Sequence, residues 1–295
     1  MLLASIGSVF FGISGVLAQI LFQSTEVSTA WLVNLRMTGA GVILLIFLKF
    51  RHYDIGTVWK QKYLGLNLIM FGIFGVLFAQ SSFLKAVYFG NAAIAPILQS
   101  LGPMFVVFLV AIIQHERPNR LDLISNAISL VGIFLLITNG NLQKLYVSPQ
   151  CIMWGIFSAI GVAAYTLLPR KLLANYSPLV VVGWGLTIGG LTSNIFTPIW
   201  KAPNALSALS ILLIVIIVII GTLLAYAMYI SSLKFLKPCM ACILGTLEPI
   251  TATLITVIFL KESFYPIQWL GGSLTIVAIL LDNLLSSKQC AKGAK

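Results

Sequence analysis

Charged residues are scarce in this chain of 295 residues, and acidic residues are the scarcest of them. Only 8% of the residues are charged, and Asp and Glu together number seven. Soluble domains carry about 25% charged residues, which supply their polar surface. With 59% hydrophobic residues and a mean hydropathy of +1.03, this chain could not cover a soluble core. The composition therefore indicates an integral membrane protein.

Cysteine is sparse as well. The four cysteines include Cys239 and Cys242, which have the C-x-x-C spacing of many metal sites, but no second pair accompanies them. A structural zinc ion needs about four ligands, so this pair alone cannot hold one. We therefore expect no metal site and no disulfide framework.

Sequence motifs of enzymes are absent too. The chain has no Walker loop, no H-E-x-x-H helix and no G-x-S-x-G turn, so we expect neither an enzyme nor a cofactor. The net charge of +11 would suit a nucleic-acid binder. The basic residues, however, form short clusters between apolar segments instead of one stripe, so we expect no nucleic-acid partner.

What the chain does have is a series of long apolar segments with short separators. About 20 apolar residues span a bilayer, so the length allows roughly ten spanning helices. Because most separators are short, we expect successive helices to run antiparallel. The predicted segments are 2–22, 29–48, 63–84, 92–113, 121–138, 150–168, 178–200, 208–230, 238–260 and 266–285.

The distribution of Lys and Arg predicts the orientation, because cytoplasmic loops are enriched in both. With the N-terminus inside, thirteen of the 18 basic residues fall in inner loops and four in outer loops. The remaining one, Arg36, lies within a predicted helix. Both termini should therefore face the cytoplasm, in a multi-pass protein of the cytoplasmic membrane of a bacterium.

An internal repeat is visible when the sequence is shifted by 146 residues. Residues 97–116, "ILQSLGPMFVVFLVAIIQHE", then align without a gap with residues 243–262, "ILGTLEPITATLITVIFLKE". Aliphatic matches are common between apolar helices, but Pro103 also aligns with Pro249, and both stretches end on a Glu. Since the repeating unit contains five helices, an odd number, the second copy must cross the membrane the other way up.

We therefore predict an all-α membrane protein with ten transmembrane helices in two inverted five-helix repeats. The first repeat covers residues 1–140, the second covers residues 150–285, and residues 286–295 form a polar cytoplasmic tail. Inverted repeats recur in secondary transporters, where the substrate binds near the midplane between the halves.

Several short motifs carry a resemblance to a known family. They are "LEP" at 247–249, "KE" at 261–262, "PIQWLGGSLTIVAILL" at 266–281, "LGP" at 101–103 and an arginine, Arg36, in the second segment. With these motifs the chain resembles the EamA family of the drug/metabolite transporter superfamily over nearly its whole length. The resemblance implies ten helices with both termini inside, in agreement with the helix count above.

The resemblance also implies a class of activity. The phrase "YFGNAAIAPILQSLGP" at 88–103 is similar to members assigned loosely to amino acids, carboxylates or amines. We therefore expect a secondary transporter of such small metabolites that works by alternating access as an exporter, with protons as a candidate coupling ion. Two other classes remain open, a membrane protein that binds a ligand without moving it and a passive channel.

Glu248 is the sharpest functional candidate, because a carboxylate within the bilayer is costly and must face protein or water. Pro249 follows it and interrupts the helical hydrogen bonds. One interpretation is a proton or substrate site beside a hinge at Pro249, with Gly102 and Pro103 as the counterpart in the first repeat. The other is structural, with Glu248 tying a kinked helix to its neighbour.

The remaining candidates are one cation and a set of polar or aromatic side chains. Arg36 either holds a substrate carboxylate or pairs within the bundle, and both arrangements would offset the cost of burying it. The other side chains either line a mixed pocket or join helices through hydrogen bonds. These predicted substrate-binding residues are Ser14, Gln19, Gln80, Gln99, Tyr165, Trp184 and Tyr226.

Overall fold

The computed structural model describes residues 1–114, 120–141, 144–202, 206–232 and 244–292. Every regular element in these ranges is helical, as the composition predicts. In chain order the elements are α1 (Leu2–Ser24), α2 (Thr29–Phe50), η1 (Thr57–Lys60), α3 (Lys62–Met70), η2 (Phe71–Leu77), α4 (Phe78–Phe89), α5 (Ile94–Gln99), α6 (Gly102–Gln114), α7 (Arg120–Thr138), α8 (Pro149–Leu167), α9 (Arg170–Asn175), α10 (Pro178–Phe196), α11 (Ala208–Val218), η3 (Ile219–Leu224), α12 (Ala225–Ser232), α14 (Leu247–Phe259) and α15 (Pro266–Lys292).

Among the described residues, seven helical stretches are long and apolar enough to cross a membrane, which confirms a multi-pass membrane protein. Two shorter apolar helices cover Leu123–Thr138 and Leu247–Phe259. The start of the predicted segment 238–260 lies partly outside the described residues. The count of ten spans therefore stays a prediction. The seven stretches are Leu2–Ser24, Thr29–Phe50, Lys62–Phe89, Ile94–Ile112, Pro149–Asn175, Pro178–Phe196 and Ala208–Tyr229.

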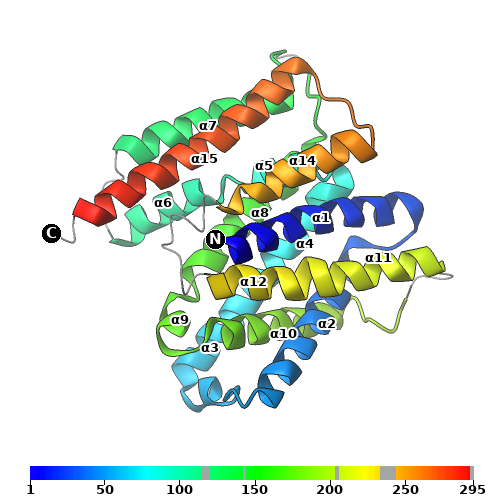
Figure 1. The fold of residues 1–295 in the computed structure, drawn as a ribbon, viewed down its shortest axis with the longest axis vertical. Helices are drawn as coiled ribbons and strands as arrows, with labels where there is room; N and C mark the ends of the chain where they lie inside the picture. Colours follow the sequence, from blue (N-terminus) through cyan, green and yellow to red (C-terminus); the bar gives the residue numbers. More distant parts are fainter. Residues whose placement is uncertain (115–119, 142–143, 203–205, 233–243, 293–295) are drawn as a thin grey trace.

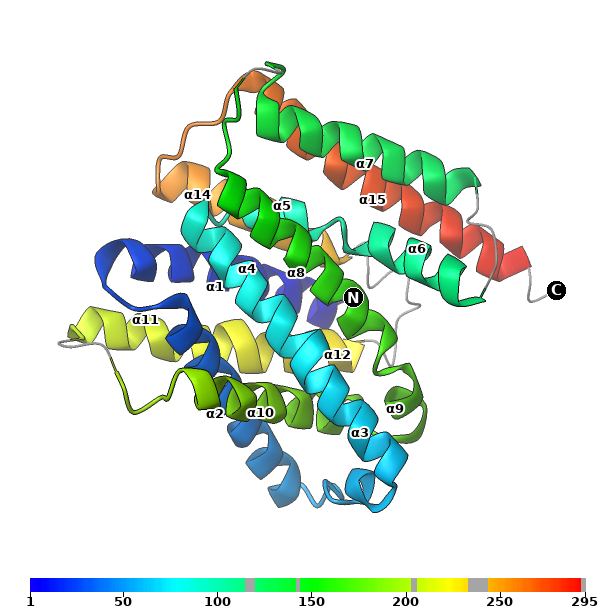
Figure 2. The same cartoon turned by 180° about the vertical axis from the view of Figure 1, so that it is seen from behind.

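Several helices that lie far apart in the sequence pack against one another in pairs. Long contacts join α2 to α10, α7 to α15 and α4 to α8, while α1 lies against both α12 and α14 (Figure 1). Seen from behind, α4 and α8 run side by side across the middle of the bundle (Figure 2). Glycine permits the closest of these approaches. A Cβ atom on Gly132 would lie 2.6 Å from the carbonyl oxygen of Gly271, so α7 and α15 meet backbone to backbone.

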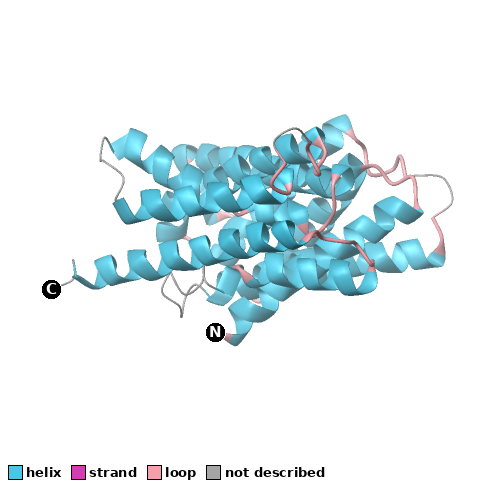
Figure 3. Cartoon of the chain, turned by 90° about the horizontal axis from the view of Figure 1, so that it is seen from above, coloured by secondary structure: helices cyan, strands magenta, loops and turns pink. Residues whose placement is uncertain are grey.

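Both ends of the described chain lie toward the same side of the bundle. Figure 3 shows α1 beginning and α15 ending at the same end of the long helices. The assignment of this side to the cytoplasm rests on the Lys and Arg distribution and stays a prediction. The same holds for the inverted repeats and their boundaries.

Two predicted segments are interrupted near a proline. The segment predicted as one helix over 92–113 divides at Ser100 and Leu101, between α5 and α6, which we call the first interruption. The second interruption is the turn at Thr246, directly before α14. Pro103 and Pro249 explain both positions, because a proline has no N–H to donate and its ring crowds the carbonyl group four residues earlier.

Two further helices each contain a wider, π-helical stretch. One is η2, which links α3 and α4 into one continuous helix, and the other is η3, which links α11 and α12. π-Helical turns are rare and recur at functional sites. In η3 the hydroxyl of Thr222 donates to the carbonyl of Ile217, five residues earlier, at 2.9 Å. This arrangement fixes the hydroxyl of Thr222 inside the bundle.

Candidate functional site

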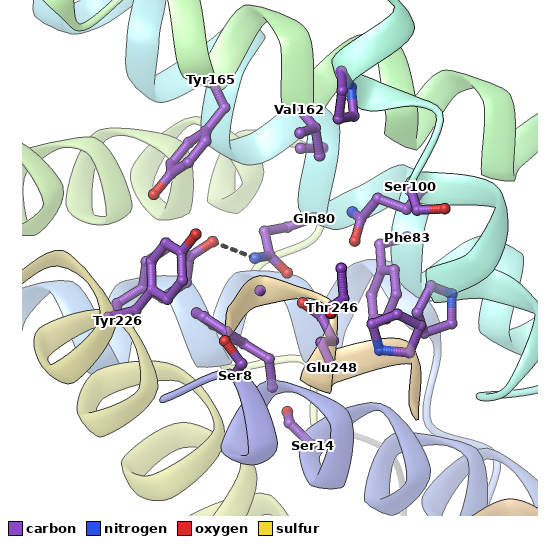
Figure 4. A pocket seen from close by; sticks show the side chains of 18 of the residues that line it. Ser8, Ser14, Gln80, Phe83, Ser100, Val162, Tyr165, Tyr226, Thr246 and Glu248 are labelled. Atoms are coloured by element: carbon purple, nitrogen blue, oxygen red, sulfur yellow. Dashed lines mark hydrogen bonds between the residues drawn. The ribbon is translucent and has the colours of Figure 1, made fainter. Parts of the chain in front are cut away.

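A pocket of about 260 Å³ lies inside the bundle, between α1, α4, α8, α12 and the two interruptions (Figure 4). Its wall combines aromatic rings, small polar groups and one charge of each sign, the mixture expected of a site for a small polar ligand. The lining residues are Ser8, Phe11, Ser14, Arg36, Ala79, Gln80, Phe83, Pro96, Gln99, Ser100, Pro103, Val162, Tyr165, Tyr226, Tyr229, Gly245, Thr246, Glu248 and Pro249.

Most of the residues predicted from sequence as substrate-binding meet in this pocket. They come from seven separate elements, so only the folded bundle brings them together. Two of the three predicted hinge residues, Pro103 and Pro249, also line it. The predicted substrate-binding residues found in the wall are Ser14, Arg36, Gln80, Gln99, Tyr165, Tyr226 and Glu248.

Three other predicted residues lie outside the pocket wall. The indole N–H of Trp184 donates to the carbonyl of Ile55 at 2.8 Å, so this side chain anchors the loop between α2 and α3. Gln19 accepts a hydrogen bond from a backbone N–H, that of Ala92, and donates one to the carboxylate of Glu262, beyond one end of the pocket. Gly102 packs against α8, where an added Cβ would lie 2.7 Å from Val162.

Arg36 is the buried cation of the pocket, with only 2% of its surface exposed. Its Nε donates to the hydroxyl of Thr222 at 3.0 Å, within η3. The Nη1 atom is buried and has no hydrogen-bond partner in the described chain. A guanidinium group has five N–H donors, and leaving one unsatisfied in a buried site is costly. Arg36, in the pocket wall, therefore keeps one buried donor that no described residue satisfies.

Glu248 is the acidic counterpart, on the second residue of α14. It lines the pocket and is half-buried, and no hydrogen bond joins its carboxylate to another described residue. The positive charge of Arg36 acts on this carboxylate through space. The two charges thus share one pocket, and each keeps bonding capacity that the described residues leave open.

Neutral polar groups and aromatic rings complete the wall. Gln80 donates from Nε2 to the hydroxyl of Tyr226 at 2.5 Å, a bond that joins residues 146 positions apart. The ring of Tyr226 meets Phe11 edge-on with centroids 4.9 Å apart, and Tyr165 lies 6.3 Å away. Gln99 donates to Ser158 at 2.6 Å. These contacts hold the wall in place before any ligand arrives.

Sequence reasoning missed several lining residues. Ser8 and Phe11 lie on the same face of α1 as Ser14, at the three-residue spacing of helical neighbours. Once Ser14 is chosen, this spacing alone would have found them. Thr246 gave no such signal, because its place in the wall depends on the turn of the second interruption.

The described lining of the pocket offers groups that can bind a polar ligand. Within the described residues, no three His, Cys, Asp or Glu side chains gather where they could hold a metal ion. The arrangement of the wall suits reversible binding of a small polar molecule.

Comparisons with known proteins agree with this architecture. The model of the EamA-like transporter family matches residues 1–138 and again residues 149–284. The inner membrane transporter YicL of Salmonella typhimurium is 36% identical over 100% of this chain and 98% of its own. Protein PecM of Dickeya dadantii is 25% identical over 84% of this chain and 80% of its own.

One solved crystal structure shares the fold, with a TM-score of 0.65 and 16% identity over 96% of this chain and 98% of the other. The family match confirms the resemblance seen in the sequence motifs. The predicted location in the bacterial cytoplasmic membrane agrees with that of the inner membrane transporter YicL. The chain belongs to the EamA-like transporter family, whose members are membrane transporters of the drug/metabolite superfamily.

Proposed function

We propose that the protein is a secondary transporter that exports small metabolites, such as amino acids, carboxylates or amines, by alternating access. The observation that carries this proposal is the pocket itself. Arg36 and Glu248 face one small cavity with unused bonding capacity, and both helix interruptions border that cavity. A site at the junction of interrupted helices is the arrangement that secondary transporters use.

The chemistry of the wall supports the substrate class. The guanidinium group of Arg36 would bind a carboxylate, and the carboxylate of Glu248 would bind an amine. The rings of Phe11, Tyr165 and Tyr226 would contact an apolar or cationic portion of the substrate. A molecule that carries both charges would use every part of this wall.

Alternating access is supported by the correspondence between the two parts of the chain. The first and second interruptions lie at aligned positions in the sequence, and η2 and η3 occur in corresponding helices. We propose that each interruption is a hinge, with Gly102 and Pro103 serving one side of the membrane and Pro249 the other. Rocking of one half against the other would then open the pocket to each side in turn.

We further propose that Glu248 couples transport to protons. A carboxylate in the membrane interior costs about 2.5–3.5 kcal/mol by insertion scales, a cost that protonation relieves. In this scheme Glu248 gives up its proton when the substrate amine binds and takes up a proton again once the substrate has left. The direction of transport, export, rests on the family resemblance.

The test begins with a search for the substrate. Metabolites excreted by cells with and without the protein are compared, and each candidate is then examined in proteoliposomes. Counterflow is expected, in which unlabelled substrate inside drives uptake of labelled substrate. Asp54→Asn, in the exposed loop between α2 and α3, serves as the variant that keeps this exchange.

Two outcomes would overturn the proposal. A protein that binds the metabolite without any flux would be a ligand-binding or regulatory protein. Flux without acceleration by substrate on the opposite side would indicate a passive channel. The counterflow signal separates both from a transporter.

A further inference from the structure

Gln19 makes two hydrogen bonds that join three separate segments of the chain. It lies on α1 and is 3% exposed. Its Oε1 accepts from the backbone N–H of Ala92 at 2.7 Å, and its Nε2 donates to the carboxylate of Glu262 at 3.3 Å. The partners fix the orientation of the amide, because an N–H only donates and a carboxylate only accepts.

Both partners belong to the interrupted helices. Ala92 lies just before α5, where Asn91 accepts from the N–H of Ala93 and Ile94 at 3.1 and 2.8 Å. Glu262 lies just after α14, beyond Lys261 with its positive φ of 53°. Gln19 thus holds those ends of α5 and α14 that lie farthest from the first and second interruptions.

The two hydrogen bonds of Gln19 lie beyond one end of the pocket. Gln19 follows Ser14, a lining residue, by five positions, which is about 7.5 Å along the axis of α1. Between them α1 is packed closely at Gly15, where an added Cβ would lie 3.5 Å from the ring of Phe83 and 4.0 Å from Ala92. Phe83 and Ala92 thus lie in van der Waals contact with α1 between the pocket and the amide of Gln19.

We propose that Gln19 is the positioning residue that keeps the outer end of the pocket closed, through its bonds to Ala92 and Glu262. The inference rests on the proposed alternating access and on the orientation predicted from Lys and Arg. Opening of this end requires α5 or α14 to swing away from α1 about its interruption, and either movement breaks a bond to Gln19. The role differs from contact with the substrate.

The chain offers a matched control for the loss of a buried amide. Gln268, on α15 and 6% exposed, likewise accepts from a backbone N–H, that of Tyr265 at 3.1 Å. It also donates to the carbonyl of Leu136 at 3.1 Å. Gln268→Leu likewise removes one bond accepted from a backbone N–H and one donated bond, here to a neutral carbonyl, at a place that joins neither α1 nor the central pocket.

The experiment measures access from outside and needs no substrate. Ser14→Cys is introduced into a variant whose native cysteines are replaced by serine, and right-side-out vesicles are treated with a membrane-impermeant maleimide. Gln19→Leu should raise the labelling rate at position 14 about tenfold, the change that one lost hydrogen bond of ordinary strength makes in an equilibrium. Gln268→Leu should leave that rate unchanged.

Variants at the partner residue keep the test decisive if Gln19→Leu fails to fold. Glu262→Leu removes one of the two bonds and should raise labelling by a smaller factor, while Glu262→Gln retains an acceptor oxygen and should restore the native rate. If both leucine variants fold, melt at a lower temperature and label at the native rate, Gln19 only satisfies the N–H of Ala92 and the proposal is overturned. Because labelling needs no substrate, this failure is distinct from a failure of counterflow.

Discussion

The two helix interruptions share a backbone arrangement and differ in their chemistry. At the first, Gly102 precedes Pro103 and presses against the side chain of Val162. At the second, Glu248 precedes Pro249, and its backbone carbonyl presses against Gly12, whose added Cβ would lie 2.7 Å from that oxygen. A proline accounts for the interruption in both, but only the second brings a charge to the pocket.

This difference separates two roles that one interruption could combine. Bending needs only the proline, which both interruptions have. A response to protonation or to substrate charge needs the carboxylate, which the second place alone supplies. Arg36, from α2, faces Glu248 across the pocket, so the charged wall draws on both parts of the chain.

The sharpest way to break the comparison is to test whether the two parts cross the membrane in opposite directions. Cysteines near Lys60 and Lys292 should react only from the cytoplasmic side, and cysteines near Lys144 and Lys201 only from the outside. The outcome is all-or-none because a maleimide that cannot cross the bilayer reaches one side. Labelling of positions 144 and 292 from the same side would show that the parts are not inverted.

The next prediction removes the charge from the second interruption and keeps its shape. Glu248→Gln should lower uphill, pH-dependent transport at least about tenfold, the size of an ordinary coupling free energy, and should leave counterflow intact. Transport against a gradient is measured in proteoliposomes with an imposed pH difference. The control is Glu26→Gln, which makes the same substitution at an exposed carboxylate in the loop after α1.

Two results at Glu248 would each change the account. A variant that unfolds at a lower temperature and still transports uphill with normal pH dependence would make Glu248 a structural tie. Normal stability together with normal pH-dependent transport would leave the carboxylate without either role.

The next prediction concerns Arg36 and the affinity for substrate. Arg36→Lys keeps the charge and loses the forked donors that reach both Thr222 and the pocket. Hydrogen bonds to charged groups contribute about 1.5–3 kcal/mol, so the KM for a carboxylate substrate should rise about 10- to 100-fold. For uncharged analogues that lack the carboxylate, the substitution should change KM little. An equal rise in KM for both kinds of substrate would contradict the contact assigned to Arg36.

The smallest effect concerns packing at the interruptions. Gly102→Ala should cost about 1–3 kcal/mol through overpacking against Val162, and Val162→Ala should relieve most of that cost. Gly12→Ala meets a backbone oxygen that no side-chain substitution can move, so the same relief should fail there. Thermal unfolding in detergent measures the stability of both glycine variants. If a compensating side-chain substitution restored stability equally at Gly102 and Gly12, the two interruptions would not differ in packing.

Much of the fold could be predicted from the sequence because bilayers impose strong rules. Apolar length and the scarcity of charge indicated a multi-pass helical protein, and Pro103 and Pro249 marked the places where helices are interrupted. The π-helical turns η2 and η3 left no readable signal. Gly72 in η2 packs against α10 and Gly221 in η3 packs against α1, contacts that only the folded bundle shows.

The candidate site was predicted in part for a similar reason. Arg36 and Glu248 were found because charges within apolar segments are costly and therefore conspicuous. Gln19 and Trp184 looked equally suitable as polar residues in helices, yet their partners are Ala92, Glu262 and Ile55, outside the pocket. A sequence shows which helix carries a polar group, whereas the direction of that group depends on the neighbouring helices.

The most direct test of the account asks whether the pocket is the path of the substrate. Val162→Cys places a thiol in the pocket wall, and a thiol reagent of sufficient size should then block the cavity. We predict that labelling at position 162 abolishes counterflow and that the transported metabolite slows the labelling. Undiminished counterflow with position 162 fully labelled would contradict the central claim that this pocket carries the substrate.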